Sequence, residues 1–238
     1  MFVHSFESMA ALDGKGIRFM VFLSGCPLRC VYCHNPDTQK AGGKYFTPEE
    51  IAKKASRFKP YFKNGGGVTF SGGEPLLQSG EIVSCADFLK KEGISYTLDT
   101  SLSVPLTEDV KCAIDKCESV IADLKFQSDE TMEKYTGKNL ENVLLNLDYI
   151  KSIKKDFILR TVVVPKLNDT LDALLSYLKI VEKYEPRYWE LLPFHTMGFF
   201  KYEEGGIPNP LKDTPPMERE KLEEIKTKLR EKTTIKIV

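Results

Sequence analysis

Short apolar runs alternate with longer amphipathic segments along the chain. The runs are rich in β-branched and aromatic residues, which favours buried strands. The predicted strands cover 16–23, 65–70, 94–100, 119–126, 157–165 and 188–194. The predicted helices cover 47–62, 79–91, 107–116, 129–135, 140–154, 169–184 and 217–232. Strands that alternate with helices in this way predict parallel βαβ units.

The number of strand–helix units limits the fold. Six units fall short of the eight that close a complete barrel, so the predicted class is α/β, an open or partial (β/α)6 barrel. No internal repeat, low-complexity stretch or linker divides the chain, which predicts one domain over 1–238. In such sheets the chemistry lies at the carboxyl ends of the strands. Polar motifs directly after strands are therefore the candidates for a site.

Local signals support two of the predicted helix ends. Thr47, Pro48 and Glu50 form a typical helix start, with Thr as N-cap, Pro at the first helical position and Glu at the third. Gly93 follows the segment 79–91 and is expected to end that helix.

Composition limits which partners and which cellular compartment are expected. Lys plus Arg and Asp plus Glu are equal at 34 each, which weakens a nucleic-acid interpretation. No apolar run approaches the roughly 20 residues that span a bilayer, and the N-terminal segment lacks a signal-peptide pattern. We therefore expect a cytoplasmic protein without membrane contact. There, the six cysteines are more consistent with metal ligands or core residues than with disulfides.

The strongest chemical motif directly follows the first predicted strand. Cys26, Cys30 and Cys33 have C-x3-C-x2-C spacing. Thiolates suit zinc or an iron–sulfur cluster. A structural zinc needs four ligands, and the only adjacent candidate, His34, is awkward beside Cys33 at one tetrahedral ion. Three cysteines on a [4Fe–4S] cluster leave one iron open for a substrate. Three unconnected core cysteines are the remaining interpretation.

Two further motifs end the next strands. Gly73 and Glu74 lie in a Ser-Gly-Gly-Glu-Pro loop, where glycine allows a close backbone approach and the carboxylate can accept from an ammonium group. By itself such a loop can equally be a tight turn. Asp99 and Thr100 end the third strand.

The later strands carry charged side chains at the same expected edge. Asp123 and Lys125 are two positions apart and would share one face of an extended strand. A carboxylate can bind ribose hydroxyls and an ammonium can pair with a carboxylate, although an isolated pair of this kind is usually a surface ion pair. His195 follows the sixth strand, where a lone histidine is either structural or part of the site.

The cysteine motif, with an aromatic Tyr32 before its last cysteine, resembles the signature of the radical S-adenosylmethionine (radical SAM) superfamily. The motifs HSFES, DGKGIR, CHN, GGGVTFSGGEPLLQ, LDT, ADLK, VVVP and LLPFH follow in one order across nearly the whole chain. This order is similar to the glycyl-radical activating enzymes of the pyruvate formate-lyase type. The segment from Cys33 to Thr47 is short and has no cysteine, which resembles the form without a ferredoxin-like insert.

The resemblance implies a fold, cofactors and ligand residues. The fold would be a partial (β/α)6 barrel of the radical SAM type, and Cys26, Cys30 and Cys33 would hold a catalytic [4Fe–4S] cluster. S-adenosylmethionine would be bound by Tyr32, Cys33, His34, Gly73, Glu74, Asp123, Leu124, Lys125 and His195. A monovalent cation, Na or K, would be bound by Asp99, Thr100, Ile121 and Asp123. Arg160 would face the substrate loop.

The resemblance also implies a reaction. Reductive cleavage of S-adenosylmethionine would give methionine and a 5′-deoxyadenosyl radical, which would take a hydrogen atom from a glycine Cα of pyruvate formate-lyase. An electron donor such as flavodoxin or ferredoxin would supply the electron, and the enzyme would be a monomer. One departure concerns the loop after the third strand, where the family usually has Asp-Thr-Asn-Gly and this chain has Ser101 and Leu102 in place of Asn-Gly. Without glycine the loop loses an easy route to positive φ.

Other functions remain open at this point. The chain could activate a different glycyl-radical enzyme or modify a peptide by radical chemistry. An iron–sulfur electron-transfer protein and a zinc-binding interaction module are the alternatives from other classes, but neither explains polar motifs at five strand ends. Cys85, Cys112 and Cys117 have no ligand spacing and are expected to be buried residues.

Overall fold

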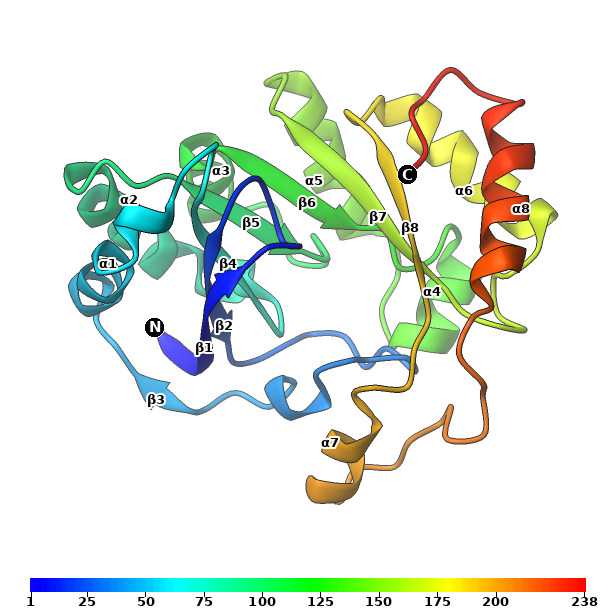
Figure 1. Cartoon of the computed structure of the whole chain (residues 1–238), viewed down its shortest axis with the longest axis horizontal. Helices are drawn as coiled ribbons and strands as arrows, with labels where there is room; N and C mark the ends of the chain where they lie inside the picture. The colour runs from blue at the N-terminus through cyan, green and yellow to red at the C-terminus, as the bar shows by residue number, and fades with distance from the viewer. The chain divides into compact units, whose positions relative to one another are not determined.

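The structure is a computed structural model that describes residues 1–238 (Figure 1). It contains two compact units, which are described separately. The first unit, called here the N-terminal unit, comprises Met1–Pro27, Thr38–Ala122 and Asn142–Asp156. The second, the C-terminal unit, comprises Leu28–Asp37, Asp123–Glu141 and Phe157–Val238.

The N-terminal unit is built on a mainly parallel sheet with the strand order β3-β1-β2-β4-β5-β6. Its strands are β1 (Phe2–Ala10), β2 (Arg18–Leu23), β3 (Lys44–Tyr45), β4 (Gly67–Gly72), β5 (Tyr96–Thr100) and β6 (Ser119–Asp123). The strands β2, β4, β5 and β6 pair in parallel, as predicted. The antiparallel strands β1 and β3 were not predicted. β1 is mostly exposed and its register shifts twice, which removes the regular alternation that identifies a strand.

Helices follow the parallel strands of this unit, and α2 contacts both α1 and α3 (Figure 1). They are α1 (Pro48–Ser56), α2 (Ser79–Lys91), α3 (Glu108–Lys116) and α5 (Glu141–Ser152). The predicted capping box is confirmed, because Thr47 and Glu50 bond to each other's backbone N–H. The predicted helix over 47–62 is wrong beyond Ser56, where a short 3-10 helix takes over at Lys59–Tyr61. Pro60 explains the break, since it has no N–H and its ring clashes with an α-helical carbonyl.

A buried arginine joins the amino-terminal ends of three parallel strands. Arg18 donates to the Thr69 hydroxyl at 2.9 Å, the Thr97 hydroxyl at 3.1 Å and the Gly65 carbonyl at 2.8 Å, and also to the Val68 carbonyl. Burial lowers the pKa of Arg18 to about 10, so the side chain stays charged at neutral pH. This end of the sheet is therefore a structural core, opposite the strand ends that carry the predicted chemistry.

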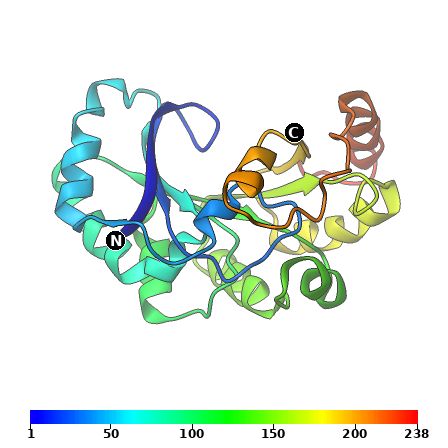
Figure 2. The same ribbon diagram turned by 90° about the horizontal axis from the view of Figure 1, so that it is seen from below.

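The C-terminal unit contains two parallel strands and four helices. They are α4 (Asp129–Thr136), β7 (Phe157–Val163), α6 (Leu171–Tyr184), β8 (Trp189–Pro193), α7 (Phe199–Glu204) and α8 (Arg219–Arg230). In Figures 1 and 2 helix α8 lies beside α6, in agreement with their contacts. Trp189 is fully buried in β8 and stacks on Tyr177 of α6 with 6.4 Å between ring centroids. The six predicted strands are all present, and the strand–helix alternation confirms the α/β class.

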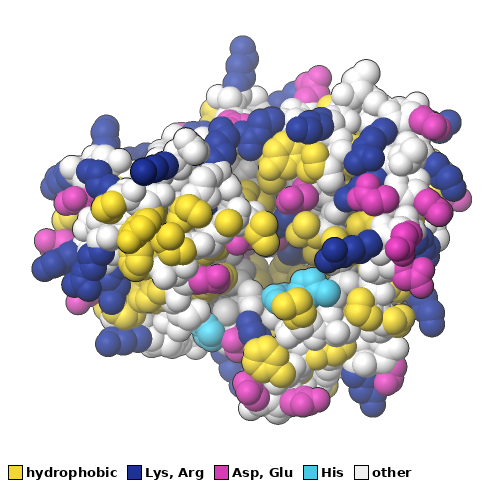
Figure 3. Space-filling model, in the orientation of Figure 1, with side chains coloured by type: hydrophobic (Ala, Val, Ile, Leu, Met, Phe, Trp, Pro, Cys, Tyr) yellow, Lys and Arg dark blue, Asp and Glu magenta, His cyan; other side chains and the backbone are white.

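The surface agrees with the balanced charge. Figure 3 shows basic and acidic side chains interspersed over the visible face, without a large field of one sign. None of the helices has the length and apolar character needed to cross a bilayer.

Candidate active site

The three motif cysteines lie on the loop after β2 and fit an iron–sulfur cluster. Cys26, Cys30 and Cys33 are half-buried and form no disulfide, and the turn between the last two is closed by a 3.0 Å bond from the Cys33 N–H to the Cys30 carbonyl. Burial raises the pKa of the Cys85 and Cys117 thiols to about 12, so these two thiols stay protonated and are poor ligands.

The cysteine motif supplies three thiol ligands. No three His, Cys, Asp or Glu side chains in residues 1–238 gather closely enough to hold one metal ion. A structural zinc would need four ligands around one ion. A [4Fe–4S] cluster instead distributes its cysteines over separate irons, so the donor set favours the cluster.

The glycine loop after β4 packs directly against the start of the cysteine loop. Glu74 N–H donates to the Gly25 carbonyl at 2.8 Å, and Gly73 N–H donates to the Leu23 carbonyl at 2.8 Å. A Cβ at Gly73 would lie 2.1 Å from the Gly25 oxygen, so no other residue fits there without a backbone shift. Gly73 thus sets the position of the residue that precedes Cys26.

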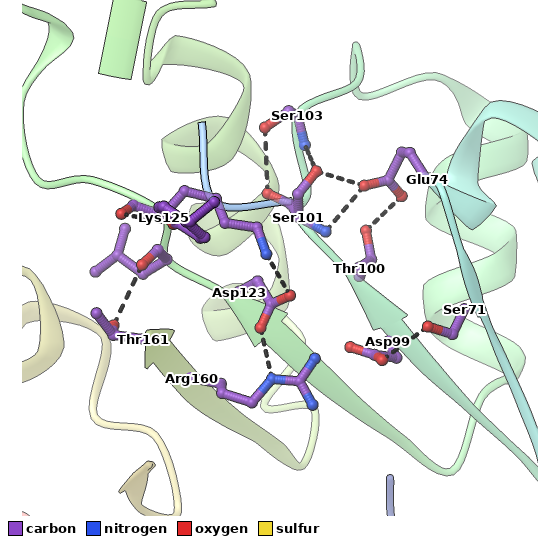
Figure 4. A network of polar contacts seen from close by, with 12 residues as sticks. Ser71, Glu74, Asp99, Thr100, Ser101, Ser103, Asp123, Lys125, Arg160 and Thr161 are labelled. Carbon is purple, nitrogen blue, oxygen red and sulfur yellow. Dashed lines mark hydrogen bonds and ion pairs between the residues drawn. The ribbon is translucent and has the colours of Figure 1, made fainter. Parts of the chain in front are cut away.

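The Glu74 carboxylate is fully buried and joins this loop to the end of β5 (Figure 4). It accepts from the Thr100 hydroxyl at 2.6 Å, from the Ser101 N–H at 2.9 Å, from the Ser101 hydroxyl at 2.5 Å and from the Leu76 N–H at 3.0 Å. Burial raises the pKa of Glu74, and these four donors oppose that rise. The predicted contact of Glu74 with S-adenosylmethionine stays a prediction, because both of its oxygens already accept from the protein.

The departure at Ser101 and Leu102 is accommodated without glycine. Leu102 adopts φ +57°, the left-handed conformation that glycine favours, and its side chain is fully buried. The Asn146 amide of α5 donates to the Leu102 carbonyl at 3.0 Å. Within β5 itself, Asp99 accepts from the Ser71 hydroxyl of β4 at 2.8 Å (Figure 4). The loop after β5 is therefore held by α5, and the strand that leads into it is bonded to β4.

A charged triad lies in the C-terminal unit (Figure 4). The Asp123 carboxylate accepts from Lys125 Nζ at 2.7 Å and from Arg160 Nε at 2.6 Å. All three side chains are less than one-fifth exposed. Burial alone would raise the pKa of Asp123, but the two cations hold it well below its usual range. Asp123 and Lys125 are thus brought together as predicted, with Arg160 as an additional partner.

The backbone of Leu124 and Lys125 is held from several sides. The hydroxyls of Tyr32 and Tyr177 donate to the Lys125 carbonyl at 3.2 and 3.1 Å. The Thr161 hydroxyl of β7 donates to the Leu124 carbonyl at 3.2 Å. Tyr32, from the cysteine motif, is thereby linked to the segment that carries Lys125.

The two predicted site histidines meet in the C-terminal unit. The rings of His34 and His195 lie edge to face with 4.6 Å between centroids. Burial and the nearby His195 and Lys201 lower the pKa of His34, so its ring is neutral at pH 7. Sequence reasoning missed Gly198, Lys201 and Tyr202, which contact His34, Asn35 and Cys33 in that order, because they have no motif of their own.

Comparison with known proteins places these features in a family. The sequence pattern of the Radical SAM superfamily matches residues 20–178, which include the cysteine motif and the strand-end motifs up to Arg160. The chain is therefore a radical SAM protein, a class that uses a [4Fe–4S] cluster and S-adenosylmethionine.

Curated relatives narrow the class. The chain is 39% identical over 233 residues to the pyruvate formate-lyase-activating enzyme of Clostridium pasteurianum, covering 96% of this chain and 97% of that protein. It is 36% identical over 225 residues to the enzyme of the same name from Streptococcus mutans, covering 90% and 85%. The chain belongs to the family of pyruvate formate-lyase-activating enzymes.

Solved structures support the fold. A radical SAM methyltransferase from Sphaerobacter thermophilus has a TM-score of 0.64 at 15% identity, over 93% of this chain and 65% of that one. A domain of a pyruvate-formate lyase-activating enzyme from Bacteroides vulgatus has a TM-score of 0.59 at 20% identity, over 73% and 98%. The predicted partial barrel of the radical SAM type is confirmed.

Proposed function

We propose that this chain activates pyruvate formate-lyase by removing a hydrogen atom from the Cα of one of its glycines. The observation that carries the proposal is the 39% identity, over nearly the full length of both chains, to a curated enzyme of that name, together with the C-x3-C-x2-C motif. When bound and reduced, the cluster and S-adenosylmethionine supply a 5′-deoxyadenosyl radical, with methionine as the other product.

The protein's own residues would bind and orient the cofactors. Cys26, Cys30 and Cys33 would hold the cluster. The candidate contacts to S-adenosylmethionine are Tyr32, Cys33, His34, Gly73, Glu74, Asp123, Leu124, Lys125 and His195. Among these, Lys125 is suited to bind the methionine carboxylate. Its ammonium group is positioned by Asp123, and its backbone carbonyl is fixed by the hydroxyls of Tyr32 and Tyr177.

Further assignments belong to the same proposal. Asp99, Thr100, Ile121 and Asp123 would bind a monovalent cation, and Arg160 would face the glycine loop of the partner. A flavodoxin or ferredoxin would deliver the electron. The chain would act as a monomeric, single-domain protein over 1–238 in the cytoplasm, where free thiols persist.

The test is anaerobic activation of purified pyruvate formate-lyase. The cluster is reconstituted and reduced, S-adenosylmethionine is added, and the electron paramagnetic resonance (EPR) spectrum is recorded with 5′-deoxyadenosine measured alongside. We expect a glycyl-radical doublet and stoichiometric deoxyadenosine. Cys30→Ala should lose the cluster and both signals, while the matched variant Cys112→Ala should keep them.

The other outcomes are equally informative. Deoxyadenosine without a doublet would reject pyruvate formate-lyase as partner and favour another glycyl-radical protein or a peptide. An intact, reducible cluster that forms neither product would reject the radical reaction and favour electron transfer.

A further inference from the structure

We propose that Tyr202 is a positioning residue that fixes the last cluster cysteine, and that Gly198 and Lys201 complete a brace from α7 onto residues 33–35. This inference deepens the proposed function and rests on it for the identity of the cluster. The observations that support it are contacts within the C-terminal unit.

The contact at Tyr202 is direct and buried. Its hydroxyl donates to the Cys33 carbonyl at 2.8 Å, and the residue is only 4% exposed. The ring packs edge to face on Phe199 at 6.3 Å, which holds the hydroxyl in place. Because Cys33 ends a tight turn from Cys30, a bond to its carbonyl fixes the orientation of the peptide between Cys33 and His34.

Two neighbouring residues hold the positions that follow. Lys201 Nζ donates to the Asn35 side-chain oxygen at 2.5 Å. A Cβ at Gly198 would lie 2.6 Å from the His34 carbonyl and 2.7 Å from His34 Nδ1, so the His34 ring lies directly against the glycine backbone. Three consecutive residues, Cys33 to Asn35, are therefore each contacted from the segment 198–202.

The spacing explains how one short helix makes all these contacts. Residues 198, 201 and 202 are three and four positions apart, so they share one face of a helical turn. Phe200 lies on another face and is 53% exposed. The brace is thus a property of α7 as a unit, and its loss should loosen the cluster loop without unfolding the strands.

Tyr202→Phe removes the hydroxyl and keeps the ring. The matched control is Tyr184→Phe, which removes another buried hydroxyl in the same unit, one that accepts from Lys183 at 2.8 Å. Hydrogen–deuterium exchange of the cluster-free protein is measured over residues 30–37. Binding of S-adenosylmethionine to the reconstituted protein is measured by titration, with the EPR spectrum of the reduced cluster recorded with and without it.

We expect Tyr202→Phe to speed exchange over 30–37 by roughly 3- to 10-fold, the effect of losing one hydrogen bond, and to weaken S-adenosylmethionine binding by a similar factor with an altered EPR spectrum. Tyr184→Phe should change none of these. Unchanged exchange and affinity in Tyr202→Phe would overturn the brace. A wild-type protein that fails to bind S-adenosylmethionine would overturn the proposed function. In that case the exchange rates of the cluster-free protein would still test whether α7 braces residues 33–35.

Discussion

Arg160 and Asp123 form a short ion pair at 2.6 Å, and both side chains are less than one-fifth exposed. The same carboxylate also binds Lys125. Replacement of Asp123 therefore affects two partly buried cations at once. Its consequences should appear in stability as well as in binding.

Asp123→Asn should destabilise the cluster-free protein by roughly 1–3 kcal/mol at pH 7, because two cations lose their partner. The folded-state pKa of Asp123 is depressed, so its contribution is present above the ordinary carboxyl pKa of about 3.9 and is lost as the pH falls towards the depressed value. In urea unfolding, the difference in unfolding free energy between the wild type and Asp123→Asn should be constant from pH 7 to 5 and should decrease below about pH 4. The exposed pair of Asp87 with Lys116 provides a control, and Asp87→Asn should have the same unfolding free energy as the wild type.

Leu102→Gly sets two effects against each other. Glycine would remove the strain of the left-handed backbone conformation at this position, which costs a non-glycine residue about 1–2 kcal/mol. It would also remove a fully buried leucine side chain, which costs about 2–5 kcal/mol. We therefore expect net destabilisation in chemical denaturation. Lys154→Gly is the matched control, since Lys154 has φ +52° but is exposed, and it should be neutral or stabilise by up to about 1 kcal/mol. A stabilised Leu102→Gly would contradict the burial argument.

Glu74→Gln should cost about 1–3 kcal/mol of unfolding free energy, because the amide NH₂ would face either the two donors of Ser101 or those of Thr100 and Leu76. Denaturant titration of the cluster-free protein measures this cost. Glu7→Gln, at an exposed position of β1, should leave stability unchanged. Equal stability of the two variants would show that the Glu74 network is not formed.

Arg18→Lys should destabilise the protein by about 2–4 kcal/mol although it keeps the charge. Lysine has three donors at one atom and does not reproduce the fork that reaches Thr69, Thr97 and Gly65. Carbonyl and hydroxyl groups left unpaired in a buried site account for the cost. Thermal unfolding should show the loss, and the exposed Arg219→Lys should not.

The sequence predicted the parts of the site that depend on local spacing. The cysteine motif and the Gly73 loop follow strands whose apolar runs are continuous, and α2 agrees with its predicted bounds of 79–91. Hydrogen bonds between residues far apart in the sequence could not be predicted from local spacing. Tyr202 and Cys33 are 169 positions apart, and nothing in the local pattern around Tyr202 distinguishes it from a core tyrosine.

The partners of charged residues were also beyond sequence reasoning. The bond from the Leu124 N–H to the Arg160 carbonyl sets β7 beside the segment after Asp123, and this register brings the Arg160 side chain to Asp123. Helix ends were mispredicted where a single residue outweighs a periodic pattern, as at Pro60.

The irregular strand β1 has a consequence for solubility. It covers the outer side of β2, the strand that leads into the cysteine loop, and β3 covers only two residues of β1 in turn. Without the first ten residues, the regular and almost fully buried β2 would become a sheet edge with unpaired backbone groups. Such an edge invites intermolecular pairing, whereas the register shifts of β1 make that strand a poorer template for it. The N-terminal segment thus keeps β2 from becoming an exposed edge of the sheet.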